Sequence, residues 1–157
     1  MLLPSLLKSG DQVYQKVIKQ LYQKMLLLNL LITLLLEEGR IARHFHYVES
    51  GMLRQYYYKN GHDITEHFSC EDDLVFCIRQ EPTRLMIEAI EPTVVYDIPY
   101  TGLQELFVSY SSIAQLYKKI LEWGLMVSQN KADSWRFETA KERYKRFLKD
   151  FPEAAKR

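Results

Sequence analysis

The feature that most constrains the fold is a change in hydrophobic period near residue 32. From there to about residue 98, apolar and polar residues alternate in short runs rich in Val, Ile, Tyr, Phe and Thr, the pattern of β-strands with one buried face. The turn compositions EEGR, ESG, KNGHD and IEPT separate these runs. The predicted strands span residues 32–36, 43–50, 52–58, 63–69, 83–90 and 93–98. Short strands at regular spacing predict a sandwich or barrel of antiparallel strands.

Helical periods flank the β-rich region. Residues 11–28 carry apolar side chains at helical spacing, which predicts an amphipathic helix. The apolar run 25–36 is predicted to be the end of that helix and the start of a first buried strand, and it is too short to span a bilayer. From residue 103 to 127, apolar residues step by three and four, which is typical of a helix that packs along a partner helix. Residues 135–148 are also predicted to be helical.

The composition is that of a globular protein from a reducing compartment. A chain of 157 residues fits one domain with a substantial core, and its net charge of +1 gives no overall signal for nucleic acid or membrane. Residues 131–157 hold nine Lys and Arg against five Asp and Glu, which indicates either a segment near DNA or a solvated helix face. Cys70 and Cys77 are too few for a disulfide framework or a zinc site, so a cytoplasmic location is predicted.

His44, His46 and Glu49 raise the alternative of a metal site on the β-scaffold. Their spacing resembles the first motif of cupins, and histidines at i and i+2 of a strand share one face. Imidazoles with a carboxylate suit Fe, Mn or Zn. The cupin spacing, however, is missed by one residue on both sides of the pair, and no second cupin motif follows. The alternation also makes Phe45 and Tyr47 the natural core residues, which places both histidines outside.

Motifs of enzymatic catalysis are absent from the sequence. It contains no G-x-S-x-G elbow, no P-loop and no G-x-G-x-x-G, and neither cysteine has a glycine beside it. The acidic cluster at residues 70–73 has the composition of a surface turn between strands. The sequence therefore predicts a protein that is not an enzyme.

The glycines and their flanks resemble those of a known β-roll. Glu38-Gly39, then Tyr47-Val48 with Gly51, then Asn60-Gly61 follow the order "L-x-x-x-G", "Y-[IV]-x-x-G" and a polar Gly turn of the cyclic-nucleotide-binding domains. The similarity is greatest to the sensor domain of the cyclic-AMP receptor protein and fumarate-nitrate regulator (Crp/Fnr) family of bacterial transcription factors. "TRLMIEAIEPTVVYDIPYTGLQELF" is similar to the last strands and the short helix before the dimer helix. "AKERYKRFLKDFP" resembles the helix before the DNA-binding domain in one branch. The resemblance covers roughly residues 30–152.

This resemblance implies an α+β fold, a jelly-roll-like antiparallel β-roll with N-terminal helices and a long C-terminal dimerisation helix. It implies an effector-sensing domain of a homodimeric regulator that acts on DNA through a further domain. Residues 1–130 would hold the roll, its helical lead and the dimer helix, and residues 131–157 would lead to a DNA-binding domain absent from this chain. The dimer contact is expected through the helix over residues 106–137. Its apolar seam consists of Leu106, Ile113, Leu116, Ile120, Trp123 and Val127.

The stretch that corresponds to the family's phosphate-binding cassette departs from the family pattern. In nucleotide-binding members, a Gly-Glu supplies the glutamate that holds the ribose, and a later Arg-Ser or Arg-Thr supplies the arginine that holds the cyclic phosphate. Residues 70–89 contain no glycine, and Thr83 falls at the arginine position with Arg84 one residue beyond, on the other face of the strand. Cyclic AMP is therefore not expected to bind tightly, and no cofactor is expected. A less charged, more apolar ligand would be contacted by Tyr56, Tyr58 or Met86. The full set of ligand-pocket candidates is Tyr56, Tyr58, Asp72, Asp73, Thr83, Arg84 and Met86.

Two other functions stay open from the sequence. One is a cupin-like metal- or small-molecule-binding protein, and the other is a dimerisation module with no ligand. No membrane partner is predicted for any of the three functions. DNA contact by this chain alone is expected only through the basic residues 131–157, without sequence preference, because base readout needs an element placed in a groove.

Overall fold

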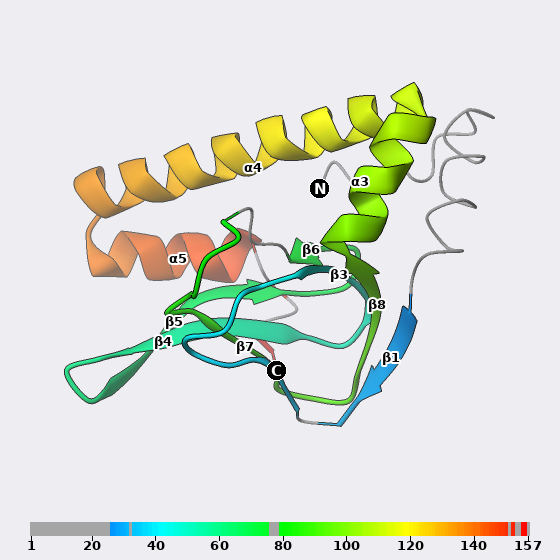
Figure 1. Cartoon of the computed structure of the whole chain (residues 1–157). Helices are drawn as coiled ribbons and strands as arrows, with labels where there is room; N and C mark the ends of the chain where they lie inside the picture. The colour runs from blue at the N-terminus through cyan, green and yellow to red at the C-terminus, as the bar shows by residue number, and fades with distance from the viewer. Residues whose placement is uncertain (1–25, 32, 76–78, 151, 153–154, 157) are drawn as a thin grey trace. The chain divides into compact units, whose positions relative to one another are not determined.

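The computed structural model describes residues 26–31, 33–75, 79–150, 152 and 155–156. The chain divides into two compact units, Met1–Ile113 and Ala114–Arg157. In the described part of the chain, the first unit contains eight strands and the helix labelled α3, and the second contains most of α4 and all of α5 (Figure 1). The predicted helix over residues 11–28 lies, up to residue 25, outside the described residues.

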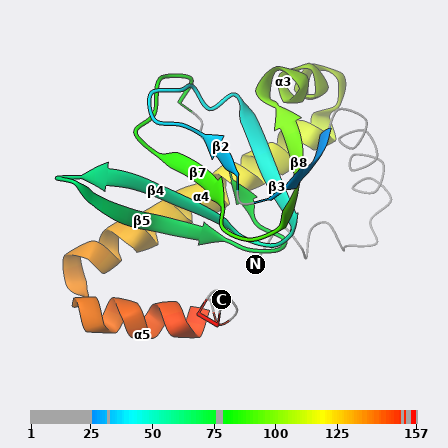
Figure 2. The ribbon, with the colours of Figure 1, turned by 90° about the horizontal axis from the view of Figure 1, so that it is seen from below.

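The strands form two four-stranded antiparallel sheets, and Figure 2 shows the second of them along β2, β7, β4 and β5. The order in the first sheet is β1-β8-β3-β6 and in the second β2-β7-β4-β5. The strands are β1 Leu26–Leu30, β2 Leu34–Leu36, β3 His44–Ser50, β4 Leu53–Lys59, β5 His62–Ser69, β6 Leu74–Val75, β7 Met86–Ala89 and β8 Thr93–Pro99. The α+β class and the antiparallel β-roll expected from the sequence are confirmed.

All six predicted strands are present, and β1 and β6 were not predicted. Residues 26–28 were expected to end a helix, and that prediction is wrong, because β1 pairs with β8 from Leu26↔Asp97 to Leu30↔Thr93. A short apolar run cannot be assigned to helix or strand from its own periodicity. In the described residues β6 comprises Leu74–Val75, which pair with β3, and two residues are too few to show a strand period.

Two glycine turns set the path of the strands. Gly51 has φ +89°, and a Cβ there would lie 2.5 Å from Thr93 Oγ1 and 2.7 Å from Thr93 Cα, so only glycine fits. The Thr93 hydroxyl accepts a hydrogen bond from the Met52 N–H at 3.1 Å, which joins this turn to the start of β8. Asn60 and Gly61, with φ +53° and +77°, form the turn between β4 and β5 that the Asn-Gly pair predicts.

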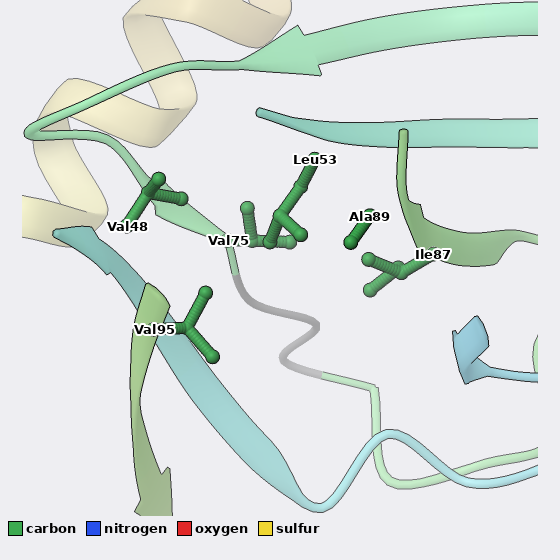
Figure 3. Packing of buried hydrophobic residues seen from close by; sticks show 6 residues of the cluster. All are labelled: Val48, Leu53, Val75, Ile87, Ala89 and Val95. Atoms are coloured by element: carbon green, nitrogen blue, oxygen red, sulfur yellow. The ribbon is translucent and has the colours of Figure 1, made fainter. Parts of the chain in front are cut away.

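The apolar core of the roll is built by both sheets. Each core side chain is at most 5% exposed, and residues of β3, β6 and β8 face residues of β4 and β7 (Figure 3). The core residues are Val48, Leu53, Val75, Ile87, Ala89 and Val95. Burying one such Val, Leu or Ile side chain contributes about 1.5–3 kcal/mol to the stability of the roll.

The helices in the described residues are α3 Tyr100–Ser109, α4 Ser111–Phe137 and α5 Ala140–Asp150. Tyr110, between α3 and α4, has an extended backbone with φ −141° and ψ 105°, and its N–H donates to the Leu106 carbonyl. The helix expected over residues 103–127, and the dimer helix over 106–137, are therefore each interrupted at Tyr110. One extended residue leaves the apolar spacing around it intact, so periodicity did not reveal the break. No helix in these described segments is long and apolar enough to cross a membrane.

A capping box starts α5 in the second unit. The Thr139 N–H donates to the Glu142 carboxylate at 2.8 Å, and the Glu142 N–H donates to the Thr139 hydroxyl at 3.3 Å. The hydrogen bond from the Thr139 backbone, helped by that from its hydroxyl, lowers the pKa of Glu142. Arg146 of α5 reaches back to Ser134 and Glu138 at the end of α4. The helical segment expected over 135–148 is thus two helices joined by a polar turn.

Candidate functional site

A polar cluster centred on Arg54 lies across β5, β4 and β7. The guanidinium donates to both carboxylate oxygens of Asp63, at 3.1 and 2.9 Å, and its Nε donates to Glu88 at 2.8 Å. Arg54 Cζ lies 4.1 Å from the ring centroid of Tyr56. The strand register explains this arrangement, because Arg54 is opposite Glu88 and Tyr56 follows two residues later on the same face.

The Arg54 charge is balanced within its own sheet. Burial opposes that charge, but the hydrogen bond to Asp63 and the negative charge of Glu88 outweigh it and raise the pKa of Arg54. Burial, with the charge of Glu88, also raises the pKa of Tyr56. Thr65 Oγ1 accepts a further bond from Arg54 at 3.2 Å. Two carboxylates thus face one guanidinium, so we expect the cluster to join the strands rather than to receive an anion.

A second polar cluster joins β3 and β8 in the other sheet. His46 Nδ1 lies 3.0 Å from Asp97 Oδ1, and His44 Nδ1 lies 3.9 Å from Asp97 Oδ2. His46 and Asp97 are each 8% exposed, whereas His44 is exposed. Glu49, the carboxylate of the metal hypothesis, is also exposed. In the segments that the structure describes, no group of three His, Cys, Asp or Glu residues is arranged to hold a metal ion.

The prediction that both histidines lie outside is wrong for His46. In the register of β3 and β8, His46 lies on the same face as Val48, which is fully buried in the core. Phe45 and Tyr47 lie on the opposite face, where the ring of Phe45 stacks on that of Tyr100 in α3 at 5.9 Å. Both faces of the sheet are therefore covered here, and alternation identifies the core face only where the other face meets water.

Three of the pocket candidates lie together on the second sheet. Tyr56 in β4 is directly opposite Met86 in β7, and each is 7% exposed. The ring of Tyr58 contacts that of Tyr56 edge-on at 6.0 Å, and Tyr58 is 58% exposed. Strand pairing thus brings these three side chains together beside Arg54. The sequence analysis did not identify Arg54 as a candidate. The cross-strand register that places Arg54 among them cannot be read from any one strand.

Thr83 and Arg84 lie in the segment before β7. The Thr83 N–H donates to the Arg40 carbonyl at 3.0 Å, and the Thr83 carbonyl accepts from the Gly39 N–H at 2.7 Å. The Thr83 hydroxyl accepts a bond from the Leu85 N–H at 3.0 Å. Arg84 is exposed. The backbone of Thr83 therefore ties this segment to the turn at Gly39, and its hydroxyl accepts from the start of β7.

Asp72 and Asp73 form the turn between β5 and β6. Asp72 Oδ1 accepts a hydrogen bond from the Tyr47 hydroxyl at 2.7 Å, and Asp72 has φ +69°. Asp73 Oδ2 accepts from the Cys70 N–H at 3.0 Å, and burial raises the pKa of Asp73. The Asp72 carboxylate thus ties the turn to β3, and the Asp73 carboxylate closes the turn itself. Both residues are on a different element from Thr83 and from Tyr56.

The residues of the expected dimer seam fall in different environments. Leu106, Ile113 and Leu116 are buried in the single chain, with 6%, 1% and 5% of their surface exposed. Ile120, Trp123 and Val127, which lie further along α4, are partly exposed. Large apolar side chains of α4 are exposed at Leu125 (61%) and Met126 (56%). The homodimer stays a prediction.

Comparison with solved structures identifies the fold as a cyclic-nucleotide-binding-like β-roll, the domain type of Crp/Fnr regulators. FixK2 from Bradyrhizobium japonicum is 19% identical, with a TM-score of 0.72 over 83% of this chain and 67% of its own. The catabolite activator protein of Thermus thermophilus is 16% identical, with a TM-score of 0.67 over 85% of this chain and 63% of its own.

A transcriptional regulator of the Crp/Fnr family from Eubacterium rectale is also similar, at 16% identity and a TM-score of 0.67 over 84% of this chain and 64% of its own. This chain thus spans about two thirds of each of these three proteins. No family model matches the sequence, and no curated protein does so either. The likeness therefore rests on the three-dimensional fold, which confirms the β-roll expected from the glycine pattern.

Proposed function

We propose that this chain is the effector-sensing regulatory domain of a cytoplasmic, homodimeric bacterial transcription regulator of the Crp/Fnr type. The observation that carries the proposal is the similarity of its β-roll to three such regulators over 83–85% of the chain. DNA would be contacted through a domain outside this chain. The chain spans about two thirds of the length of those three proteins.

The junction between the roll and α3 supplies a route for regulation. β8 continues into α3 at Tyr100, whose N–H donates to the Arg43 carbonyl at 2.9 Å and whose ring stacks on Phe45. The first turn of α3 is thus held by β3 and β8 together, so a ligand that moves either strand would move α3. A coupling of about 1–3 kcal/mol is enough for allosteric control.

The effector is proposed not to be cyclic AMP. A cyclic phosphate must exchange its hydration for a cation and oriented N–H donors. Thr83 offers only an uncharged hydroxyl, and the charge of Arg54 is balanced by Asp63 and Glu88. A lost charge-assisted pair costs about 2–5 kcal/mol, so affinity should fall by at least tens-fold relative to a competent cassette. A less charged ligand beside Tyr56 fits this surface better.

Calorimetric titration with cyclic AMP and cyclic GMP tests the ligand proposal. We expect no saturation at low-micromolar nucleotide. Low-micromolar binding that is lost in Arg84→Ala and retained in Arg79→Ala would show instead that Arg84 holds the phosphate. That outcome would overturn the ligand proposal and leave the regulator proposal standing.

Elemental analysis of the purified chain separates the regulator from the cupin-like alternative. The regulator proposal predicts less than stoichiometric Fe, Mn and Zn. One equivalent of such a metal, lost in His46→Gln, would favour the cupin-like protein. His62→Gln, at an exposed histidine of the β4–β5 hairpin, is the matched control.

A further inference from the structure

We propose that the corner between α4 and α5 binds single-stranded nucleic acid, RNA or DNA, through exposed aromatic rings that lie beside a row of lysines. This corner belongs entirely to the second unit (Figure 1). We call it the basic–aromatic surface, and it consists of Trp135, Phe137, Lys141, Tyr144, Lys145 and Lys149. Binding at this surface does not depend on the regulator proposal.

Three large aromatic side chains of this surface are open to water. Trp135 is 70% exposed, Phe137 80% and Tyr144 62%. Exposed apolar groups rimmed by polar residues mark interaction sites on soluble proteins. The guanidinium carbon of Arg143 lies 4.9 Å from the centroid of the Trp135 ring, so a cation already stands beside one of these rings. Aromatic rings combined with cations are the means by which proteins hold the bases of single strands.

The lysines of α5 form a row along one side of the helix. Lys141, Lys145 and Lys149 follow one another at four-residue steps, which places them about 6 Å apart along the helix axis. Like charges at this spacing repel each other and destabilise a helix. None of the three lysines is in an ion pair with another described residue. A polyanion that follows the row would relieve this repulsion.

The carboxylates closest in sequence to this row are bonded within the corner itself. Glu138 accepts a hydrogen bond from the Ser134 hydroxyl at 2.9 Å and pairs with Arg146. Glu142 accepts from the Thr139 N–H at 2.8 Å and from the Thr139 hydroxyl at 2.7 Å. Both carboxylates are thus directed toward the turn between the helices rather than toward the lysines. The charge of the row is therefore left for a ligand from outside the chain.

The directions of the rings favour a flexible single strand over a flat membrane or a duplex. Trp135 and Phe137 are two residues apart on α4, so their side chains leave the helix about 200° apart, and a flat surface cannot meet both. In a duplex the base pairs cover each other's faces, whereas the bases of a single strand are free to stack on aromatic side chains. A single strand can place its phosphates along the lysines and its bases against the rings. The basic charge of residues 131–157 alone predicts only contact with phosphates, and the rings add the preference for single strands.

Fluorescence anisotropy of labelled strands titrated with the full chain tests the proposal. The probes are oligouridylate and oligothymidylate of about 20 nucleotides, with a DNA duplex of equal length as the comparison. We expect a dissociation constant of about 1–100 µM in about 50 mM salt for at least one of the single strands, and weaker binding of the duplex. Tighter binding of oligouridylate would identify RNA as the ligand, and tighter binding of oligothymidylate would identify single-stranded DNA.

Variants on α5 separate stacking from charge. Tyr144→Leu removes the ring and keeps an apolar side chain, so affinity should fall at least about five-fold, whereas Tyr144→Phe keeps the ring and should bind like the wild type. Lys145→Gln should reduce the slope of log affinity against log salt by about 0.7. Both residues are exposed, so neither change should unfold α5. Lys118→Gln is the matched control, because Lys118 is an exposed lysine of α4 that pairs with Glu122 at 3.7 Å, and it should leave affinity and slope unchanged.

Three results would overturn the proposal. One is a wild-type chain that binds neither single strand at low salt, including the case in which it binds vesicles of phosphatidylcholine and phosphatidylserine instead, which would assign the surface to an anionic membrane. Another is an affinity for the duplex that equals or exceeds the affinity for both single strands. The third is an unchanged affinity in Tyr144→Leu, which would reduce the contact to lysines and phosphates.

Discussion

Replacement of Arg54 by Met tests whether the polar cluster on the second sheet is a structural clamp. Met keeps much of the aliphatic volume over Tyr56 and removes the guanidinium from Asp63 and Glu88. The Glu88 side chain is 27% exposed, so its lost bond should cost about 1.5–2 kcal/mol. Asp63 is 37% exposed and more strongly screened, so its pair adds about 0.5–1 kcal/mol. The expected loss is about 2–3 kcal/mol in the free energy of unfolding.

Urea unfolding followed by circular dichroism measures this loss. Arg79→Met is the matched control, because Arg79 pairs with Glu81 at 3.0 Å while the two side chains are 82% and 59% exposed. The control should change the free energy of unfolding by less than about 0.5 kcal/mol. Equal, small losses in both variants would refute the reasoning, since Arg54 would then be screened by water and open to an anionic ligand.

Three further predictions concern other parts of the chain. Gly51→Ala should cost about 3 kcal/mol or more in the free energy of unfolding, because it adds a clash with β8 to the strain of a positive φ. The control Gly39→Ala, where an added Cβ has nothing within 4 Å, should cost about 1–2 kcal/mol. Similar losses in the two variants would exclude the clash. Ile120→Asp should turn a dimer into monomer or aggregate by light scattering, while Gln115→Asp should not; a monomeric wild type at micromolar concentration would refute the dimer. Because the pKa of Glu142 is lowered on folding, its contribution is present above the ordinary carboxyl pKa and lost as pH falls through the folded value. Protection of residues 140–150 from hydrogen exchange should therefore drop in acid, and Glu142→Gln should remove that drop. An unchanged drop in Glu142→Gln would show that the Glu142 cap does not cause it.

Local signals in the sequence predicted most of the β-roll. The alternating runs located six strands, and Asn60-Gly61 located the hairpin, because strand period and positive φ depend on neighbouring residues alone. β1 was taken for a helix end because the run over Leu26–Leu30 is apolar at every position but one, so only pairing with β8 distinguishes strand from helix. The break at Tyr110 left no trace in the apolar spacing.

The polar clusters could not be predicted from the sequence, because each joins residues distant along the chain. Arg54 and Glu88 are brought together by the register of β4 and β7, and His46 and Asp97 by that of β3 and β8. A shift by one residue would place either pair on opposite faces. Alternation placed His46 on the face opposite Phe45, as the structure does, but that face was predicted to be exposed. Val48 on the same face is fully buried, and Phe45 on the other face stacks on α3.

The most direct test of the central claim, that this roll transmits its state to a DNA-binding domain, is operator affinity in a fusion protein. Residues 1–150 would be joined to a helix-turn-helix domain of known half-site, and binding to DNA with two half-sites would be measured by fluorescence anisotropy. Tyr100→Ala removes the stack between Phe45 and α3. The account predicts that this variant changes operator affinity by about 5- to 100-fold with no change in molar mass, as expected for allosteric coupling. Equal operator affinity in the two fusions would contradict the claim.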